Sequence, residues 1–395
     1  MPSGPFVGIR VLDFTQFEAG PCATALMSDM GAEVIKIERP GVGDPGRYLN
    51  KRENGYSLYF NTHSRGKRSV TLDVRTPEGR EIIHKLIKSA DVMVNNRQVG
   101  QMERMGLGYD QVSAINPRII YASSSAYGPR GPRASAAGFA STGLAESGLT
   151  WASWPDGKPI TAMGAALGGD QVPGVYLAFA ISSALVARER TGVGQRVDTS
   201  QLGALVRMAN AAINTAMYTS SPALPPGLAS PLIAGSFVCG DGKYLSMGML
   251  SVDKWVSLCG ALEWNDWQED PGYTTQQARA DKVDSIRRRL AETFLKRPAS
   301  EWVKRFDQYD MPSAVVQSFA DVGNDPQVLA NGYITEVDDP RWGKQRVVGL
   351  AIEMEKTPGE VQGLAPDLGE HTDQYLSQIG YSASQIANLR TKKVV

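Results

Sequence analysis

The sequence predicts an α/β protein with a doubly wound parallel sheet and a second, smaller α+β domain. A strand-like run at 9–14, IRVLDF, is followed by a loop, a helix from Pro21 and another strand at 32–38. This β-loop-α-β unit of about 30 residues is the building block of parallel sheets covered by helices. The alternation continues to residue 123, and a Pro-rich stretch precedes a segment of shorter strands and helices.

Local signals define the elements of the first domain. Gly31 is suited to end the first helix in a left-handed conformation, and Thr76-Pro77-Glu78 opens the helix GREIIHKLIKSA. Further strands are expected at 70–74, 91–94 and 118–123, with a short helix at 110–116. Ligands of parallel sheets bind in the loops at the carboxyl ends of the strands. Those loops are expected at 15–21, 39–68, 95–104 and 124–139.

The second half of the chain contains the smaller domain. A turn and strand at 192–198 and a helix at 200–217 lead to the Pro-rich segment 221–230, which is typical of a linker. Short strands at 236–238 and 244–247 and several helices follow. A Gly/Asn/Pro stretch at 321–332 leads out of this domain, and the last elements are expected as a strand at 341–352 and a closing helix.

Composition indicates a cytoplasmic protein that binds neither nucleic acid nor membranes. Lys plus Arg and Asp plus Glu both number 41, so the net charge attracts no polyanion. The three cysteines include no CxxC pair, which suits a reducing compartment and argues against a zinc site. No signal peptide is evident at the N-terminus, and no apolar run reaches the ~20 residues of a membrane span.

Asp170 is the strongest candidate for a catalytic carboxylate. It follows the small-residue segment GAALGG, and a long apolar helix is expected to begin at about Pro173. Unpaired N–H groups and the helix dipole would then keep Asp170 ionised beside glycines that admit a ligand. A buried carboxylate among such donors is suited to form covalent acyl intermediates. The alternative is that Asp170 only caps the helix.

Basic residues gather in the expected loops of the N-terminal half. Arginine gives bidentate contacts to phosphates, so these loops suit a phosphate-rich ligand. The alternative for each residue is a solvated surface position. Loop placement favours a set of four: Arg39, Lys67, Arg68 and Arg104.

Two polar residues of the first loop, Gln16 and Glu18, are placed to hydrogen-bond a substrate carboxylate or thioester oxygen. For Glu18 the equal alternative is to cap the helix that follows. His63, beside Arg65, is expected at the surface or at the rim of the site, and His84 and His371 as structural residues.

With these residues in place, the chain resembles the class III CoA-transferases, the family of formyl-CoA and carnitine CoA-transferases. The resemblance covers nearly the whole length and depends on many ordered matches. They include VLDFTQFEAGPCATALMSDMGAEVIKIERPGVGD, KRSVTLDVRTPEGREIIHKLIKSADVMVNN, MERMGLGYD, NPRIIYASSSAYGPRGP, GDQVPG, GVGQRVDTS and LGEHTDQYLSQIGYS.

The resemblance implies a large Rossmann-like domain built from both chain ends, a small domain between them, and two ring-like subunits interlinked as a homodimer. The expected domains are 1–220, 221–330 and the return segment 331–395. Coenzyme A and acyl-CoA are then substrates, a small carboxylic acid is the acceptor, and no metal or permanent cofactor is expected. Asp170 would attack the thioester, giving a mixed anhydride and then an aspartyl-CoA thioester.

Other residues match the family by position. Arg39, Asn96, Arg104 and one base of the Lys67–Arg68 pair resemble its CoA contacts. There are three departures: Arg97 replaces the usual aromatic residue after Asn96, Phe139 follows Gly138 in a GFA turn that lacks the usual acidic residue, and Glu18 replaces a glutamine. These changes argue against formyl-CoA and oxalate as the substrates. By position Arg97 is still expected to contact CoA, and Phe139 to contact the substrate.

Two other functions are weighed against this one. An α-methylacyl-CoA racemase shares the fold but uses a histidine where Phe139 stands, and phenylalanine cannot exchange protons. A non-catalytic CoA-binding subunit of a hetero-oligomer has no reason to keep Asp170. The sequence does not name the acids; candidates for an acyl pocket, which are equally suited to a core, are Trp151, Trp154, Met163, Met247 and Met249.

Overall fold

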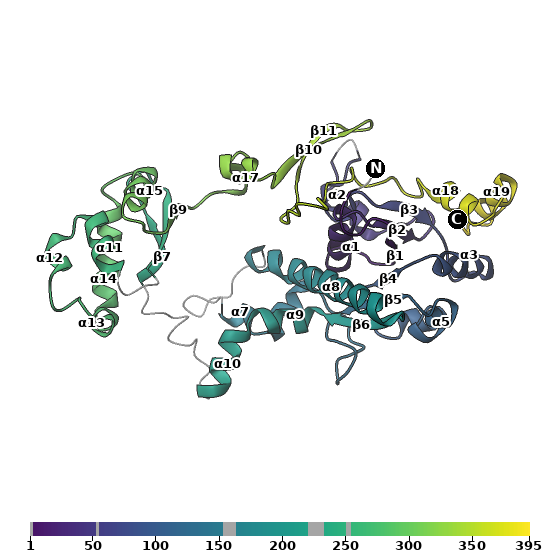
Figure 1. The fold of residues 1–395 in the computed structure, drawn as a ribbon, viewed down its shortest axis with the longest axis horizontal. Helices are drawn as coiled ribbons and strands as arrows, with labels where there is room; N and C mark the ends of the chain where they lie inside the picture. The colour runs from purple at the N-terminus through teal and green to yellow at the C-terminus, as the bar shows by residue number, and fades with distance from the viewer. Residues whose placement is uncertain (1–2, 53–54, 153–162, 220–232, 250–253) are drawn as a thin grey trace. The chain divides into compact units, whose positions relative to one another are not determined.

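The computed structural model describes residues 3–52, 55–152, 163–219, 233–249 and 254–395. The chain forms two compact units, one of Met1–Asn210 with Leu329–Val395 and the other of Ala211–Val328 (Figure 1). The domain limits expected from the sequence, 220 and 330, stay a prediction. The expected linker at 221–230 and Trp154 lie outside the described residues.

A six-stranded sheet forms the centre of the first unit. Its order is β3-β2-β1-β4-β5-β6, and every pair of neighbours is parallel. The chain therefore winds outward in both directions from β1 and β4, which confirms the predicted α/β class and the parallel sheet. The strands are β1 (Arg10–Asp13), β2 (Glu33–Glu38), β3 (Arg68–Thr71), β4 (Val92–Asn95), β5 (Ile120–Ser125) and β6 (Gln195–Ser200).

Successive residues of each strand are buried on opposite faces of the sheet, because side chains alternate along a strand. Val11 packs with α1 (Ala19–Asp29) and α8 (Met163–Thr191) on one face, whereas its neighbour Leu12 belongs to the core of the other face. Each fully buried side chain of this kind contributes roughly 1.5–3 kcal/mol to folding. The helices on the second face are α3 (Pro77–Lys88), α5 (Tyr109–Ile115), α18 (Thr372–Gln378) and α19 (Ala383–Thr391).

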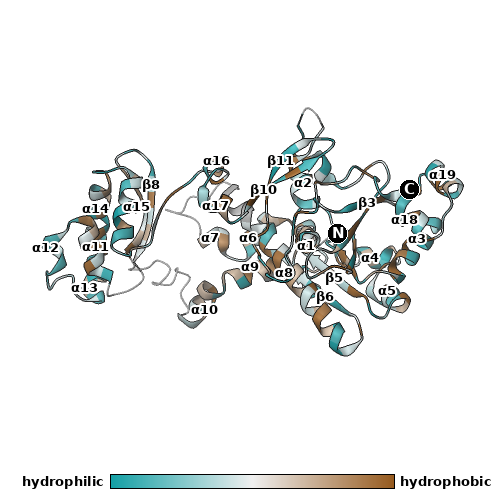
Figure 2. Ribbon diagram, turned by 45° about the horizontal axis from the view of Figure 1, so that its top comes forward, coloured by the Kyte–Doolittle hydropathy of each residue, from teal (hydrophilic) through white to brown (hydrophobic). Residues whose placement is uncertain are grey.

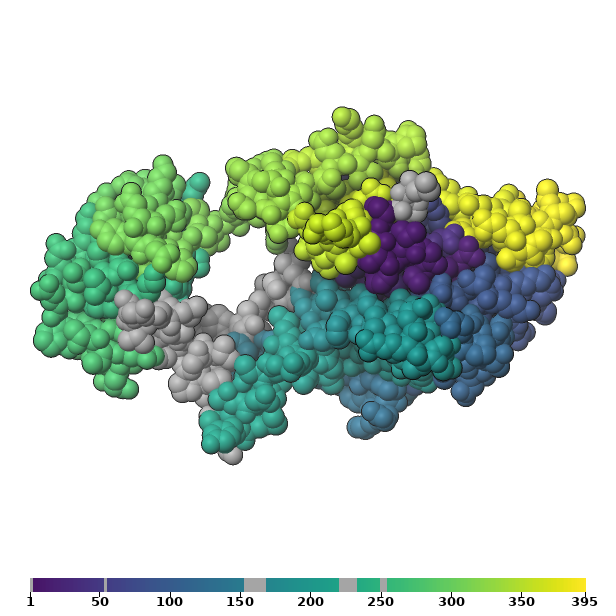
Figure 3. All heavy atoms as spheres, viewed as in Figure 1, coloured from purple at the N-terminus to yellow at the C-terminus, as the bar shows by residue number. Residues whose placement is uncertain are grey.

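The C-terminal segment returns to the first unit. Thr372 Oγ1 accepts a hydrogen bond from the Thr71 amide at 3.0 Å, and the Val394 carbonyl accepts one from Asp73 at 2.8 Å. Figure 3 shows the last residues, in yellow, lying against the purple and blue N-terminal part. The antiparallel pair β10 (Ile334–Asp339) and β11 (Gly343–Val348) precedes them. The sequence reading expected β11, as part of a longer strand at 341–352. It did not expect β10, because the sequence of that strand, ITEVDD, is rich in acidic residues.

Helix α8 begins at Met163, so the prediction that Pro173 opens it is wrong. Proline inside a helix removes one backbone hydrogen bond, and its ring crowds the carbonyl four residues earlier, here that of Gly169. Close packing holds the helix together through this point. A Cβ on Gly174 would lie 2.8 Å from Cys22 Cβ of α1, so only glycine allows this approach.

One helix of the described residues, Gly168–Thr191, is long and apolar enough to cross a membrane by length and composition. The sequence reading expected no apolar run long enough to span a membrane, so this helix was not expected. A single helix of this kind is weak evidence, because core helices pass the same test. Leu177, Ile181 and Leu185 are buried in the core shared with the sheet.

The remaining helices of the first unit lie around the sheet. The 3₁₀ helix at Pro45–Tyr48 and α2 (Leu58–Ser64) fall in the segment 39–68 that was expected as a loop. The others are α4 (Gln101–Arg104), α6 (Ala140–Glu146), α7 (Leu149–Ala152) and α9 (Gln201–Met208).

The second unit has its own core around a small antiparallel sheet. Ile286, Leu290 and Phe294 are buried on one side of α14, and Figure 2 shows apolar and polar residues alternating along this helix. Its elements are β7 (Ile233–Val238), β8 (Tyr244–Met249), β9 (Ser313–Val315), α11 (Trp255–Leu262), α12 (Asn265–Gln268), α13 (Gln276–Asp281), α14 (Val283–Phe294), α15 (Ala299–Gln308) and α16 (Phe319–Val322), with α10 (Asn210–Thr219) and α17 (Pro326–Ala330) at its boundaries.

Candidate active site

A pocket of about 330 Å³ opens at the carboxyl ends of β1 and β4. The strand order reverses between these two strands, and this is where open parallel sheets bind their ligands. The loops after β1, β4 and β5 supply most of the wall, and α8 and α9 supply one residue each. The polar lining residues are Gln16, Glu18, Tyr59, Asn96, Arg97, Gln98, Gln101, Ser124, Ser125, Asp170 and Gln201.

Asp170 faces this pocket from the interior of α8. Its Oδ1 accepts a 2.6 Å hydrogen bond from Gln201 Nε2. Burial, together with the charge of Glu18, raises the pKa of Asp170 from 3.8 to about 6. The expectation that a helix start keeps this carboxylate ionised is therefore wrong. The helix begins at Met163, and the dipole effect fades after the first turn.

Glu18 binds the residue next to Asp170. Gln171 Nε2 donates to Glu18 Oε1 at 2.9 Å, and Cys22 Sγ donates to Gln171 Oε1 at 3.0 Å. Glu18 stands at the N-cap of α1, yet its side chain makes no capping hydrogen bond. Capping of the helix, one of the two roles weighed for Glu18, is therefore not observed, and hydrogen bonding in the pocket is the role that remains. Burial and the charge of Glu18 raise the pKa of Cys22 to about 11, so this group stays a thiol and a donor.

Two aromatic rings, those of His63 and Tyr59, lie close to Glu18. His63 Nε2 is 3.8 Å from Glu18 Oε2, and the ring of Tyr59 contacts that of His63. The sequence reading expected His63 at the surface or at the rim of the site, but its side chain is buried and is not among the residues that line the pocket. Burial and the charge of Lys67 lower the pKa of His63 to about 4, so it is neutral near pH 7. Burial and the charges of Glu18 and Asp170 raise the pKa of Tyr59, which stays a phenol.

The loops after β1 and β4 are joined by side chains. Asn96 Oδ1 accepts from the Gln16 amide at 2.8 Å, and Asn96 Nδ2 donates to the Gln16 carbonyl at 2.7 Å. Arg97 Nη1 donates to Gln16 Oε1 at 2.7 Å. The structure thus brings together in one pocket six residues predicted for the site: Gln16, Glu18, Asn96, Arg97, Phe139 and Asp170.

Phe139 forms part of an apolar wall. Its ring meets that of Phe17 edge-on with 6.1 Å between centroids, and it is 64% exposed. Phe17 has a φ of 63°, which is uncommon for a bulky residue and turns the chain into Glu18 and α1. No proton-transfer group stands at position 139.

Lys67 lies in the core rather than at the pocket. Its ammonium is fully buried and contacts Asp13 Oδ2 at 3.0 Å, Thr24 Oγ1 at 2.8 Å and the carbonyl of Pro21 at 3.1 Å. Burial opposes the charge on Asp13, but Lys67 and Lys36 outweigh it and lower the pKa of Asp13 to about 2. This ion pair ties the end of β1 to α1 and so shapes the loop that carries Glu18.

The other predicted basic residues lie outside the pocket lining. Arg39, after β2, and Arg104, in α4, are exposed at the carboxyl side of the sheet. Arg68 is the first residue of β3, at the opposite edge, where its guanidinium lies 3.5 Å from His371 Nε2. It contributes to a different pocket with Arg10 and Tyr375.

Sequence reasoning missed four residues of this site. Tyr59 and Gln201 lie in no motif that was singled out, Gln171 lies in the matched GDQVPG segment but was given no role, and Cys22 was considered only as one of three thiols. Gln201 could have been found from its position directly after a strand of the parallel sheet, because strand ends meet at the same edge.

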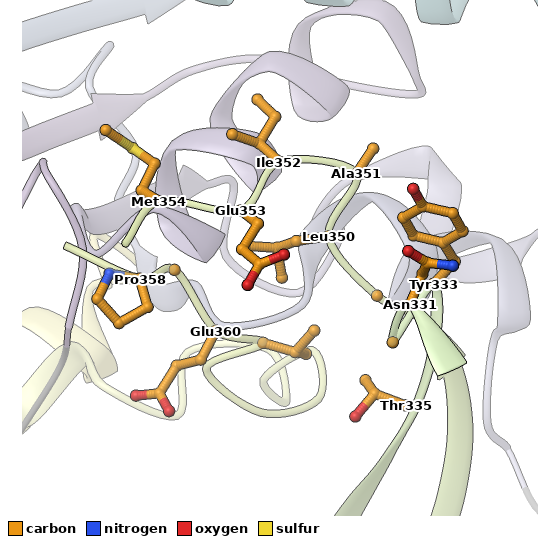
Figure 4. Close-up of a pocket in the computed structure, with 14 residues that line it drawn as sticks. Asn331, Tyr333, Thr335, Leu350, Ala351, Ile352, Glu353, Met354, Pro358 and Glu360 are labelled. Atoms are coloured by element: carbon orange, nitrogen blue, oxygen red, sulfur yellow. The ribbon is translucent and has the colours of Figure 1, made fainter. Parts of the chain in front are cut away.

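A second pocket, of about 310 Å³, lies in the return segment (Figure 4). Glu353 and Glu360 are among its lining residues, and no Lys, Arg or His is, so it offers little to a phosphate. The proposed acyl-pocket residues are not gathered at either site: Trp151 is half-exposed on α7 and Met247 is buried in the second unit. The side chains of Met163 and Met249 lie outside the described residues.

The strand order and the pocket at its reversal define an α/β enzyme of the Rossmann type. A family model described as CoA-transferase family III matches residues 6–372. A formyl-CoA:oxalate CoA-transferase of Rhodopseudomonas palustris (strain BisA53) is 32% identical over 408 residues, covering 97% of this chain and 95% of the relative. One from Escherichia coli O157:H7 (strain EC4115) is 31% identical and aligns over 100% of both chains.

Solved structures agree with these relatives. Rv3272 from Mycobacterium tuberculosis has 30% sequence identity and a TM-score of 0.82, covering 95% of this chain and 100% of that one. A CAIB/BAIF family protein from Brucella suis has 26% identity and a TM-score of 0.83 with the same coverage. The chain belongs to CoA-transferase family III. It is a transferase whose substrates include coenzyme A thioesters.

Proposed function

We propose that this enzyme moves CoA from an acyl-CoA donor to a carboxylic acid through covalent intermediates on Asp170. The observation that carries the proposal is a single carboxylate with a raised pKa, facing a pocket at the reversal point of the sheet. A pKa of about 6 leaves Asp170 mostly ionised near pH 7, while burial strips it of water and favours its attack on carbon.

Each step exchanges one acyl bond for another. Oδ2, which has no hydrogen-bond partner among the described residues, attacks the thioester carbonyl; the C–S bond breaks, leaving a mixed anhydride and CoA thiolate. The thiolate attacks the Asp170 carbonyl carbon and releases the donor acid, giving an aspartyl-CoA thioester. The acceptor carboxylate attacks this thioester, and the freed thiolate then takes the new acyl group, which regenerates the carboxylate.

Neighbouring residues would assist without reacting. Gln201 holds Oδ1, so the other oxygen keeps its direction toward the pocket. Gln171 links α8 to Glu18 in the first loop and fixes the distance between the two carboxylates. We assign CoA contacts to Asn96, and to Arg39 and Arg104, whose exposed guanidinium groups suit the phosphates. Lys67 supports the site from the core.

A homodimer in the cytoplasm is part of the proposal. Val175, Phe179 and Val186 of α8 are more than half exposed, an apolar surface that a second copy of the chain would cover. The interlinked ring arrangement remains an expectation from the family. Light scattering on the purified protein measures its oligomeric state.

The relatives are named for formyl-CoA and oxalate. Glu18 adds a negative charge beside Asp170, which disfavours a small dianion close to the nucleophile. Neither the racemase nor the non-catalytic subunit gains support from any observation, since Phe139 has no titratable group and Asp170 has a perturbed pKa.

The direct test is trapping of the intermediate. The protein is incubated with acyl-CoA, quenched and digested, and the Asp170 peptide is examined by mass spectrometry with and without hydroxylamine. We expect an adduct on this peptide, absent from Asp170→Asn and present in Asp110→Asn, an exposed aspartate on α5 that serves as a matched control. Turnover by Asp170→Asn at the wild-type rate would refute the proposal.

A further inference from the structure

Arg97 brings an uncompensated positive charge into the pocket. Its side chain is partly buried, and Nη1 donates to Gln16 Oε1 at 2.7 Å. Nε is buried and has no hydrogen-bond partner. In the part of the chain that the structure describes, no carboxylate lies within ion-pair distance of this guanidinium. A charge removed from water is normally paired, so the described residues leave this partly buried guanidinium free to accept an anionic partner.

The nearest negative charges are already used. Asp44 pairs with Lys36 at 2.8 Å, and Asp13 pairs with Lys67 at 3.0 Å. Burial lowers the pKa of Arg97, and the distant charges of Asp44 and Asp13 only partly oppose this effect. The guanidinium remains ionised at any physiological pH, and among the described residues its contact partner is the neutral amide of Gln16 and not a carboxylate.

The guanidinium is also held in place. Asn96 clamps the backbone of Gln16 with two hydrogen bonds, and Gln16 in turn accepts from Arg97. Gln16 is thus a positioning residue for Arg97. A charged donor fixed before the ligand arrives loses little conformational entropy on binding.

Arg97 and Asp170 line the same pocket, and no ion pair joins them in the described part of the chain. One cavity therefore offers a ligand both the guanidinium and the carboxylate. The rings of Phe17 and Phe139, in contact on the wall, offer an apolar surface to a carbon chain.

We propose that Arg97 binds a second carboxylate of the substrate, so that the enzyme acts on dicarboxylic acids with a carbon spacer. The reacting end meets Asp170, and the far carboxylate accepts hydrogen bonds from the guanidinium. This inference rests on the proposed CoA transfer and names its substrate class. It gives Arg97 a role different from the CoA contact that its place in the sequence suggested.

Isotope exchange tests the inference without knowledge of the natural donor. The enzyme is given glutaryl-CoA with labelled glutarate, and separately valeryl-CoA with labelled valerate, which has the same carbon number and a methyl group in place of the second carboxylate. Label entering the thioester is followed by chromatography and mass spectrometry. We expect kcat/KM for the glutarate pair to exceed that for the valerate pair by about 10- to 100-fold, the worth of a charged hydrogen bond.

Substitution of Arg97, with Arg80 as a control, tests whether Arg97 causes the preference for the glutarate pair. Arg97→Met should lose about 10- to 100-fold on the glutarate pair and change the valerate pair less than about threefold. Arg80→Met, which removes an exposed arginine of α3, should leave both unchanged. The affinity of Arg97→Met for free CoA, measured by calorimetry, should stay within about threefold of wild type, because Arg97 is not assigned to CoA.

The outcomes separate this inference from the proposed function. Equal exchange of the two pairs by the wild-type protein overturns the inference and leaves CoA transfer intact, and this comparison needs no folded variant. An equal loss on both pairs in Arg97→Met, with weaker CoA binding, assigns Arg97 to CoA and likewise overturns it. Exchange of neither pair overturns the inference, because a five-carbon dicarboxylate is then no substrate, whereas the proposed CoA transfer is decided separately by trapping of the Asp170 adduct.

Discussion

Asp170→Asn should stabilise the protein while abolishing turnover. Burial and the charge of Glu18 raise the pKa of Asp170 from 3.8 to about 6. That difference corresponds to about 3 kcal/mol of destabilisation when the group is ionised. Asparagine has nearly the same shape and keeps an oxygen to accept from Gln201, but it carries no charge to desolvate.

The effect has a defined pH window. Because the folded protein holds the Asp170 proton more tightly than the unfolded chain, wild-type stability falls as pH rises from about 4 to about 6 and is lowest above that range. The advantage of the variant should therefore be up to about 3 kcal/mol at about pH 8 and about 1 kcal/mol at about pH 4.5.

Urea unfolding of both proteins at these two pH values measures the difference, with Asp110→Asn as a control that should track wild type at both. A variant that is no more stable at about pH 8, or whose advantage does not shrink in acid, would show that the carboxylate is solvated in the folded protein. Either result would remove the physical basis for its reactivity.

Three further substitutions probe the surroundings of the nucleophile. Glu18→Gln removes a neighbouring charge, so the acidic limb of the kcat/KM profile should move to lower pH, by about one unit or less because burial is the larger cause. Gln201→Leu removes the donor that favours the charged form of Asp170, so the same limb should move to higher pH; shifts in the same direction would contradict both assignments. Lys67→Met leaves Asp13 buried without its ammonium partner and should cost about 3–5 kcal/mol in urea unfolding. An unchanged urea midpoint would mean that Lys36 alone can neutralise Asp13.

Local patterns were enough to predict the sheet and the edge at which the pocket lies. The β-loop-α-β unit and the alternating apolar strands identified β1, β2, β4 and β5 to within a few residues. Parallel pairing then puts every loop that follows a strand at one edge, so Gln16, Glu18 and Asn96 could be predicted together. This inference needs no long-range information, because the edge is common to all strands.

The same local rules misplaced two groups whose surroundings depend on distant residues. Pro173 usually marks a helix start, but packing of Gly174 on α1 extends α8 through it and leaves Asp170 within the helix. Lys67 was expected at a ligand because it falls in a loop predicted to lie at the carboxyl ends of the strands. Its partner Asp13 lies 54 residues away in the sequence, and no local pattern reports such a buried pair.

The arrangement of charge around the pocket explains why these distant contacts matter for function. Glu18 and Asp170 place two carboxyl groups in the pocket, and Gln171, next to Asp170 in α8, donates a hydrogen bond to Glu18. A carboxylic acid approaching these two groups is repelled unless another charge draws it in. Arg97, held by Gln16 in the same pocket, supplies that charge. A substrate with an anion at its far end would be both attracted and oriented, so its thioester or acid group would meet Asp170 first.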